Sequence, residues 1–580
     1  MPEPSAASQS GARPVTAPAI GDPLCVPASF ARFIVPFAYR LDRKAGPLSA
    51  ATTRFVEAGA DDWLHGANAG KLDRRILFDL ARRRYLTHET AEVLFSRARW
   101  FVLHDPSAES ARVWKSVKLA RHDGSGEYRV VFRPPALVLF ETDQQCASPD
   151  DHDILQTGLL VLEAFYPKPE DNEKGPDLAD ILAFHEAFRH TRRPFFGHED
   201  PLIKRLDQQW KVSEPNRSEP AGDPDEYRRY HGRWTELLAL PVETNCDDGG
   251  RTLASLGFPA RTKDAIHPAW AVDADGRAHV CACVLVEENS AADPPLAPIR
   301  EFGRGLKAPA QLGYWRRLLN VDKLPDDPRD LHENTEFERD WTESRTYLRW
   351  AHYGTAQGFT GHSTMMLGAP CGEPPTWLHF GQMYFDQLLL MLYVRASIFR
   401  FSRRLSSISA EARKARGGDA PDFTQFREDF ARLRLDFDLF TNLYRFPLLS
   451  TEQQAVEMFE KLNAALDIEA IYKEVENEVD GTHDVLELLA TQRFSRVAMV
   501  LSVLGVLGVL AGLIQAVLSF TGLEQIKGTN WIAIVLTVAG VAVLFVFGFL
   551  LAAAKWPRKI EDMLTQFLEP RTKPRKHHRP

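Results

Sequence analysis

The sequence predicts an α/β (α+β) N-terminal cytosolic domain, followed by a bundle of long helices, a stalk helix and two C-terminal transmembrane helices. Three observations lead to this fold class. Short strand-like runs mix with helical segments in the first half, long helices with regular apolar spacing follow, and two uninterrupted apolar stretches lie near the C-terminus. The expected divisions of the 580 residues are a disordered leader at 1–30, the α/β domain at 31–340, the helical bundle and stalk at 341–496, the transmembrane hairpin at 497–554 and a basic cytosolic tail at 555–580.

Apolar runs bounded by turn residues predict the strands of the N-terminal domain. They lie at 33–41, 101–104, 113–119, 128–132, 136–141, 157–165 and 278–287. Asp123-Gly124 suits a hairpin turn between two of these strands. Asp177 is the expected N-cap of a helix that places Leu178, Ile181, Leu182, His185 and Phe188 on one side.

Beyond about Trp341 strand signals disappear, and long helices are predicted at 377–406 and 422–446. The second has a heptad seam, typical of a helix packed lengthwise against partners, formed by Phe423, Phe426, Phe430, Leu433, Phe437, Phe440 and Tyr444. A third helix is expected to start near Asp467 and to continue through Arg496 into the apolar region. Gly481 is its weak point, either as a hinge or as a glycine that the bundle tolerates.

The two apolar stretches, 497–520 and 531–554, are each long enough to cross a bilayer, because about 20 helical residues span its hydrocarbon core. The short link between them makes a helical hairpin. Lysine and arginine flank the outer ends of both stretches, which places both termini in the cytosol. The first 23 residues lack the apolar region of a secretory signal, so the N-terminal domain is expected to stay in the cytosol. Together with the two apolar stretches, this predicts a multi-pass protein of the cell inner membrane.

One seven-residue register of the third helix indicates a conduit. Its stalk part carries the acidic residues Asp480, Asp484 and Glu487, which would attract cations around a central axis shared by several copies. Phe494 and Leu501 would then form an apolar gate. The predicted pore-lining residues are Ala498, Leu501, Gly505, Gly508, Gly512, Gln515, Ser519 and Gly522. The alternative is close packing of membrane helices without a pore, which small residues also permit.

This order of a large cytosolic domain, long helices, a stalk helix, a first span, a short loop and a second span with a basic tail resembles the CorA superfamily of divalent-cation channels. The resemblance covers the architecture of roughly 341–559 and, weakly, the N-terminal half. It implies a homo-oligomer, a pentamer, in which the first span lines the pore, the second faces lipid, and magnesium is the default ion.

The chain departs from this family where the first span ends. The family has a Gly-Met-Asn triplet there, whereas this chain has Phe520-Thr521-Gly522. Two residues of the link are candidates to act at the outer entrance, Glu524 as a charged ring and Asn530 within a displaced triplet, Gly528-Thr529-Asn530. The missing triplet leaves the choice of ion open.

Other motifs indicate no catalytic centre, so the chain is not expected to be an enzyme. His185 and His190 lack the four-residue spacing of a zinc-protease helix. The glycine-rich stretch 349–363 either cradles a phosphate-bearing ligand or forms a structural loop before the long helices. Acidic patches at 150–153 and 326–327 are candidates for regulatory cations between subunits, and the metal ligands stay unassigned.

The sequence therefore predicts an oligomeric inner-membrane cation channel or transporter similar to CorA, gated by its cytosolic domain. No cofactor is expected, and a divalent cation such as Mg²⁺ is the substrate or a regulator. The partners are the lipid bilayer, other copies of the chain, and a small-molecule or cation ligand on the cytosolic domain; the net charge of −8 argues against nucleic acid. Two alternatives remain: a CorA-like effector channel opened by a nucleotide second messenger in antiviral defence, and a membrane-tethered scaffold that does not conduct.

Overall fold

The structure is a computed structural model. It describes residues 29–39, 41–42, 54–58, 82–104, 113–122, 124–140, 156–167, 175–191, 202, 205–206, 242–243, 252–253, 277–285, 309–323, 335–351, 355–368, 376–415 and 423–520. Some side chains inside these segments, among them those of Phe494 and Ser519, are not part of the description. The chain divides into two compact units, Met1–His483 and Asp484–Pro580.

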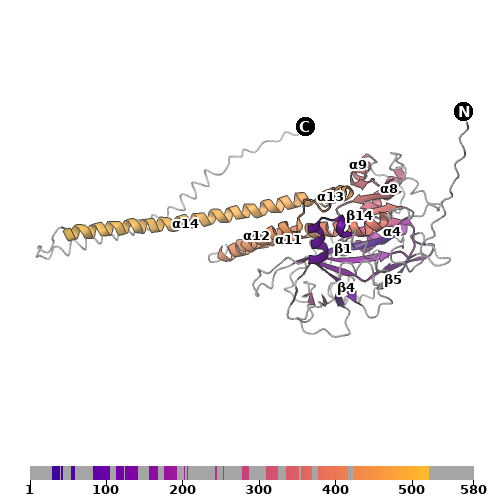
Figure 1. Ribbon diagram of the computed structural model, residues 1–580, viewed down its shortest axis with the longest axis horizontal. Coiled ribbons are helices and arrows are strands. Elements are labelled where there is room, and N and C mark those ends of the chain that lie inside the picture. Colours follow the sequence, from indigo (N-terminus) through magenta and orange to yellow (C-terminus); the bar gives the residue numbers. More distant parts are fainter. Residues whose placement is uncertain are drawn as a thin grey trace, which may run out of the picture. The chain divides into compact units, whose positions relative to one another are not determined.

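A mixed sheet forms the centre of the first unit (Figure 1). Its strands are β1 (Phe30–Tyr39), β3 (Arg54–Ala58), β4 (Ala98–His104), β5 (Lys115–Ala120), β6 (Glu127–Phe132), β7 (Ala136–Phe140), β8 (Gln156–Phe165), β9 (Val242–Glu243), β11 (His279–Leu285), β12 (Thr346–Tyr347), β13 (Thr355–Phe359) and β14 (Ser363–Gly368). Their order is β12-β13-β14-β11-β1-β8-β7-β4-β3-β9, and the β5–β6 hairpin joins through β6, which pairs with β8. The pairs β11–β14 and β3–β9 are parallel, and the other pairs of this sheet are antiparallel. Two short strands, β2 (Leu41–Asp42) and β10 (Thr252–Leu253), pair separately.

Helices cover both faces of this sheet. On one face lie α4 (Leu178–Arg189) and α8 (Pro309–Asn320), and α9 (Thr335–Arg345) contacts α8. On the other face lie the π-helical turn η6 (Phe380–Tyr384), which follows α10 (Thr376–His379), and the long helix α11 (Phe385–Ala415). The helices α12 (Phe423–Tyr444) and α13 (Gln453–Ala465) pack on α11, and α14 (Ile468–Phe520) follows. A short helix, α3 (His88–Glu92), continues into the π-helical turn η1 (Val93–Arg97).

Strand β1 shows how the sequence separates the two faces, because successive side chains of a strand point to opposite sides. Phe33 is fully buried and packs against Phe184 and Phe188 of α4, with ring centroids 5.9 and 4.6 Å apart. Its neighbour Arg32 points to the other face, where it donates a hydrogen bond to the Gly381 carbonyl of η6. One strand thus contributes to both layers of helix packing.

The opposite face also contains a buried ion pair. Arg32 Nε donates to Glu163 Oε2 at 2.6 Å, and Arg133 Nε lies 3.0 Å from Glu163 Oε1. Burial alone would raise the pKa of the Glu163 carboxyl, but the Arg133 and Arg32 guanidiniums beside it hold that pKa below its usual value. Glu163 therefore stays ionised, and its charge is compensated inside the sheet.

The α+β character of the body is confirmed, and each strand expected before residue 290 has a counterpart within a few residues of its predicted bounds. The Asp177 cap is confirmed: its side chain accepts from the Asp180 N–H, and Asp180 reciprocates as a capping box. Five of the seven seam positions of α12 are confirmed as buried, namely Phe430, Leu433, Phe437, Phe440 and Tyr444; Phe426 is half-buried, and the Phe423 side chain is outside the description.

Two expectations about the second half were wrong. Strand signals do not end at Trp341, because β12, β13 and β14 follow it and β14 pairs with β11 of the same sheet. The boundary expected at 340/341 thus runs through one sheet. The helical region also has an additional helix, α13, between the loop at Phe446-Pro447 and α14.

Helix α14 begins next to Asp467, as expected, and its first turns pack against α12. Phe437 and Tyr472 stack with ring centroids 5.5 Å apart, Arg445 lies over the Tyr472 ring at 3.7 Å, and Arg445 Nη2 donates to Glu469 Oε2 at 2.7 Å. The helix continues through Gly481 without interruption. These contacts fix the beginning of α14 to the bundle.

Replacing Gly481 by alanine is expected to raise the free energy of unfolding by about 1 kcal/mol, because alanine loses less backbone entropy than glycine in a helix interior. A Cβ atom at this position would meet nothing within 4 Å, so no clash offsets the gain. The measurement is the midpoint of thermal unfolding of the full-length protein in detergent. A lower midpoint would show that position 481 needs a bend that alanine resists.

Among the described residues, no helix combines the length and the apolar character needed to cross a bilayer. The first predicted span, 497–520, belongs to α14 by its backbone. The second predicted span at 531–554 and the basic tail at 555–580 lie outside the described residues, as does nearly all of the predicted leader. The two transmembrane helices therefore remain a prediction.

Candidate functional site

The predicted pore residues from Phe494 to Ser519 all lie on one helix, α14, whose regular backbone keeps them in the same seven-residue register. A Cβ atom built on Gly505, Gly508 or Gly512 meets nothing within 4 Å, so no side chain of the described part of the chain fills the space beside them. Ala498, Leu501 and Gln515 are exposed. Gly522, Glu524 and Asn530 lie outside the described residues.

The acidic residues of this register lie on a different side of α14 from its buried stripe. Tyr472, Val475 and Val479 are buried, whereas Asp484 and Glu487 are exposed. With 100° per residue, the acidic register lies roughly 130° around the helix from the buried stripe. The acidic side chains of this register are therefore not part of the buried stripe of α14.

Asp480 has a partner in the same chain. Arg434 Nη2 of α12 lies 3.3 Å from Asp480 Oδ1, and more than half of the Asp480 side chain is exposed. Such an exposed pair contributes at most about 1 kcal/mol to stability. Arg434 nevertheless offsets part of the negative charge that a ring of Asp480 side chains would present.

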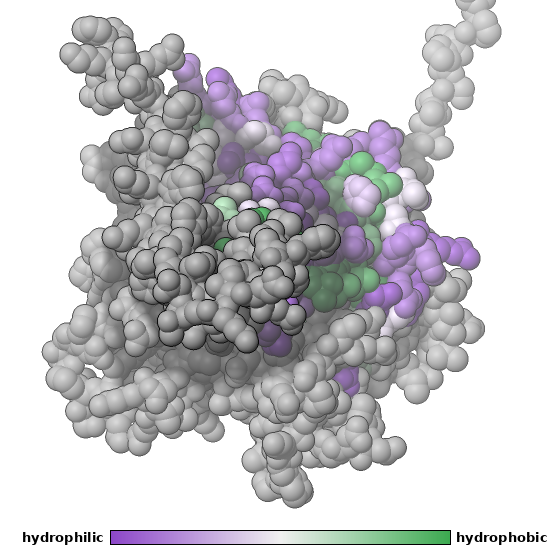
Figure 2. All heavy atoms as spheres, turned by 90° about the vertical axis from the view of Figure 1, so that its left-hand side faces the viewer, coloured by the Kyte–Doolittle hydropathy of each residue, from purple (hydrophilic) through white to green (hydrophobic). Residues whose placement is uncertain are grey.

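Large apolar side chains are uncovered on the second half of α14. Met499, Leu501, Leu504, Val506 and Val509 are between 57% and 64% exposed. At 100° per residue these five positions point to several sides of the helix. Figure 2 shows hydrophobic residues in green reaching the surface among hydrophilic residues in purple.

A second candidate site is a cavity of about 300 Å³ in the first unit. It lies where the end of α8, the β13–β14 turn, α11 and the α13–α14 junction meet, and Trp341 and Arg345 of α9 contribute to its wall. Its polar lining comes from Asn320, Arg345, Thr360, His362, Arg395 and Asp467. The described part of the glycine-rich stretch 349–363 forms β13 and this turn, and its Gly361 and His362 line the cavity.

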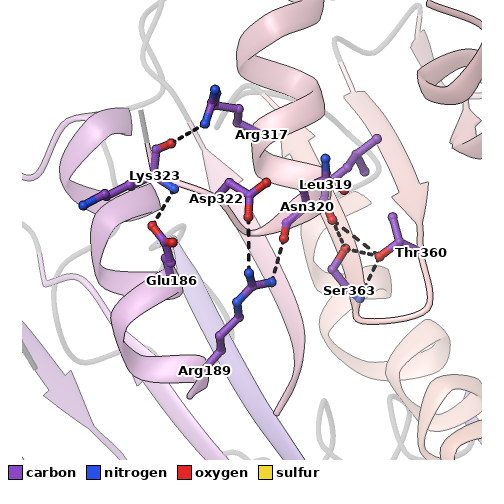
Figure 3. A network of polar contacts seen from close by, with 9 residues as sticks. All are labelled: Glu186, Arg189, Arg317, Leu319, Asn320, Asp322, Lys323, Thr360 and Ser363. Carbon is purple, nitrogen blue, oxygen red and sulfur yellow. Dashed lines mark hydrogen bonds and ion pairs between the residues drawn. The ribbon is translucent and has the colours of Figure 1, made fainter. Parts of the chain in front are cut away.

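Hydrogen bonds hold one wall of the cavity in place (Figure 3). Thr360 and Ser363 from the β13–β14 turn both donate to the Leu319 carbonyl at the end of α8. Arg189 of α4 donates to the Asn320 carbonyl at 2.6 Å and to Asp322 Oδ1 at 3.2 Å. The hydrogen bonds to Leu319 therefore hold the β13–β14 turn firmly against the end of α8.

The described residues include two non-glycine residues with positive φ, and both adjoin this cavity. Val321 (φ 61°) follows Asn320 and ends α8, with the Asp322 N–H bonded to the Arg317 carbonyl and the Val321 N–H to the Leu318 carbonyl. This is the Schellman arrangement, in which glycine is the usual residue. Asp467 (φ 53°) precedes α14. A β-branched residue in the left-handed region is strained, and such strain concentrates at functional sites.

Two buried histidines of the body are neutral at physiological pH. Burial lowers the pKa of His185 to about 3, and its Nε2 atom is paired with the Tyr166 hydroxyl at 3.0 Å. Burial, together with the nearby His362 and Arg395, lowers the pKa of His279 to about 3. Neither histidine is therefore a source of positive charge in the body.

Within the described ranges, no three histidine, cysteine, aspartate or glutamate side chains come together in a way that could hold a metal ion. The acidic patches at 150–153 and 326–327 lie outside those ranges. Sequence spacing also did not indicate the cavity, because its lining residues are up to 147 positions apart, from Asn320 to Asp467. The glycine-rich turn at 361–362 was the one local signal.

Comparisons with known proteins found no match: no family model, no curated protein and no solved structure is similar to this chain.

Proposed function

We propose that the protein is an oligomeric inner-membrane cation channel similar to CorA, in which α14 lines the pore and the α+β body controls it. The observation that carries this proposal is the single unbroken α14, which presents acidic residues at its stalk and open glycines further along the same register. Packing alone would explain the glycines. It would not explain why exposed acidic residues continue the same register toward the body.

The exposed apolar residues of α14 support a membrane position for its second half. Side chains such as Leu501 and Val509 are uncovered in the single chain, and lipid or the helices of other copies would cover them. A strict seven-residue register drifts by about 20° per heptad on a straight helix, so several copies would supercoil to keep it directed at an axis. Both requirements are met by a membrane-embedded homo-oligomer.

The test is ion flux through the purified full-length protein in lipid vesicles that enclose a magnesium-sensitive dye. We expect Mg²⁺ entry above that of protein-free vesicles, and a native mass several times that of one chain. If monovalent gradients collapse without Mg²⁺ entry, the effector channel becomes the better account. A protein that conducts neither kind of ion would leave the membrane-tethered scaffold.

A further inference from the structure

The cavity at the β13–β14 turn differs from the rest of the body in how its arginines are compensated. Largely buried arginines elsewhere each have a carboxylate within 3.4 Å, namely Arg32, Arg82, Arg121 and Arg189. Arg345 and Arg395, which line the cavity, have no carboxylate within ion-pair distance in the described part of the chain. Two guanidiniums thus line one cavity without forming an ion pair with a carboxylate of the described residues.

Arg395 lies at the cavity with one contact to its wall. Its Nη1 atom donates to the Gly361 carbonyl at 3.2 Å, which keeps the guanidinium at the cavity. Its Nε atom is buried and has no hydrogen-bond partner among the described residues. A buried donor without a partner costs roughly 1–3 kcal/mol, so a native structure needs a reason to keep one.

Two further groups line the cavity beside Arg395. Arg345 lies over the Trp341 ring, 4.4 Å from its centroid, and donates to the Trp341 carbonyl and the Ser344 hydroxyl, which orients its guanidinium. His362 adds a ring nitrogen from the β13–β14 turn, next to Arg395. These groups come from α9, the turn and α11, so the site is assembled from three separate elements.

The start of α14 forms the remaining side of the cavity. Asp467 and Ala465 line it directly before the first turn of the helix, where unpaired backbone N–H groups and the helix dipole favour an anion. The Asp467 carboxylate would oppose an anion, but this residue is exposed. The two guanidiniums therefore decide the sign of the site.

We infer that this cavity binds a small organic phosphate, with Arg395, Arg345 and His362 as ligands of the phosphate group. Phosphate presents several oxygens with delocalised charge and matches guanidinium donors arriving from different directions. The volume of about 300 Å³ exceeds the needs of a bare phosphate ion and leaves room for a small organic part.

The position of the site assigns it a regulatory role, which rests on the proposed channel function. A bound phosphate ester would bridge the rigid β13–β14 turn and the residues that start α14. It would thereby stabilise one arrangement of the α13–α14 junction over others and shift the channel between states by its difference in affinity. The organic phosphate is thus the expected gating ligand.

The experiment is calorimetric titration of the full-length protein in detergent with AMP and inorganic phosphate, and with succinate as a dicarboxylate. We expect saturable binding of AMP at one site per chain and weaker binding of inorganic phosphate. The Arg395→Gln variant should bind AMP about tenfold more weakly or worse, because charge-assisted hydrogen bonds are lost. Arg404→Gln is the matched control on the same helix, since Arg404 pairs with Asp436 outside the cavity, and its affinity should be unchanged.

Arg345→Gln guards against a folding defect, because it leaves the bond from Arg395 to Gly361 intact and should also weaken binding. Thermal unfolding without ligand shows whether each variant is folded. No AMP binding, equal affinity in both cavity variants and the wild type, or tighter binding of succinate would each overturn the inference. Flux in vesicles is read separately: binding without flux would contradict the channel alone, and flux without binding would contradict the regulatory site alone.

Discussion

Replacing Gly512 by leucine is expected to reduce ion flux by about tenfold or more, because a ring of leucines at the axis would close and dewet the pore. Gly512 lies in the register that the proposal directs toward the axis, and the space next to its Cα is open in the single chain. Gln515→Leu should act in the same way, since it removes an amide that can offer oxygen to an ion. The measurement is Mg²⁺ entry into vesicles with equal amounts of incorporated protein.

The matched control is Ala511→Leu, which adds similar bulk about 100° around the same helix. Ala511 is exposed and lies outside the predicted pore register, so flux should stay near the wild-type rate. Unchanged native mass of all three variants excludes a loss of assembly. Flux that survives in Gly512→Leu, or that falls equally in Ala511→Leu, would mean that this register does not face the ion path.

Replacing Asp386 by alanine is expected to destabilise the body by about 3–5 kcal/mol, the cost of breaking a buried ion pair by removal of one partner. Arg82 donates from Nε to Asp386 Oδ2 at 2.9 Å and from Nη2 to Oδ1 at 2.7 Å, and both side chains are at most 1% exposed. The alanine variant leaves a buried guanidinium without this carboxylate. The measurement is urea unfolding of the full-length protein in detergent, followed by tryptophan fluorescence.

Two comparisons separate the charge effect from a packing effect. The double variant Arg82→Met, Asp386→Leu removes both charges and fills the space with apolar groups, so most of the lost stability should return. Asp436→Ala breaks the partly exposed pair with Arg404 and should cost less than about 1 kcal/mol. If Asp386→Ala costs no more than Asp436→Ala, the buried pair does not hold α11 to the helical segment 82–85.

The two wrong predictions about the fold, that no strands follow Trp341 and that no helix lies between Pro447 and Asp467, have different causes. The strands β13 and β14 are buried on both faces, so their sequences show no apolar alternation, and their glycines resemble loop residues. β14 pairs with β11, about 80 residues earlier, and β13 joins the sheet by pairing with β14. Helix α13 did have a signal, because its buried residues Ala455, Met458 and Leu462 follow helical spacing.

Local patterns along the chain predict its separate elements and the chemistry of α14. Spacing along the chain is enough to place the Asp177 cap, the seam of α12 and the register from Asp484 to Gln515, because each depends on neighbours a few residues apart. Contacts between distant residues, in contrast, depend on how the elements pack. The Arg82–Asp386 pair and the cavity lined by Arg345 and Arg395 require the order of the strands and the packing of helices on both faces. Local periodicity specifies which face of an element is apolar, but it does not specify the element against which that face packs.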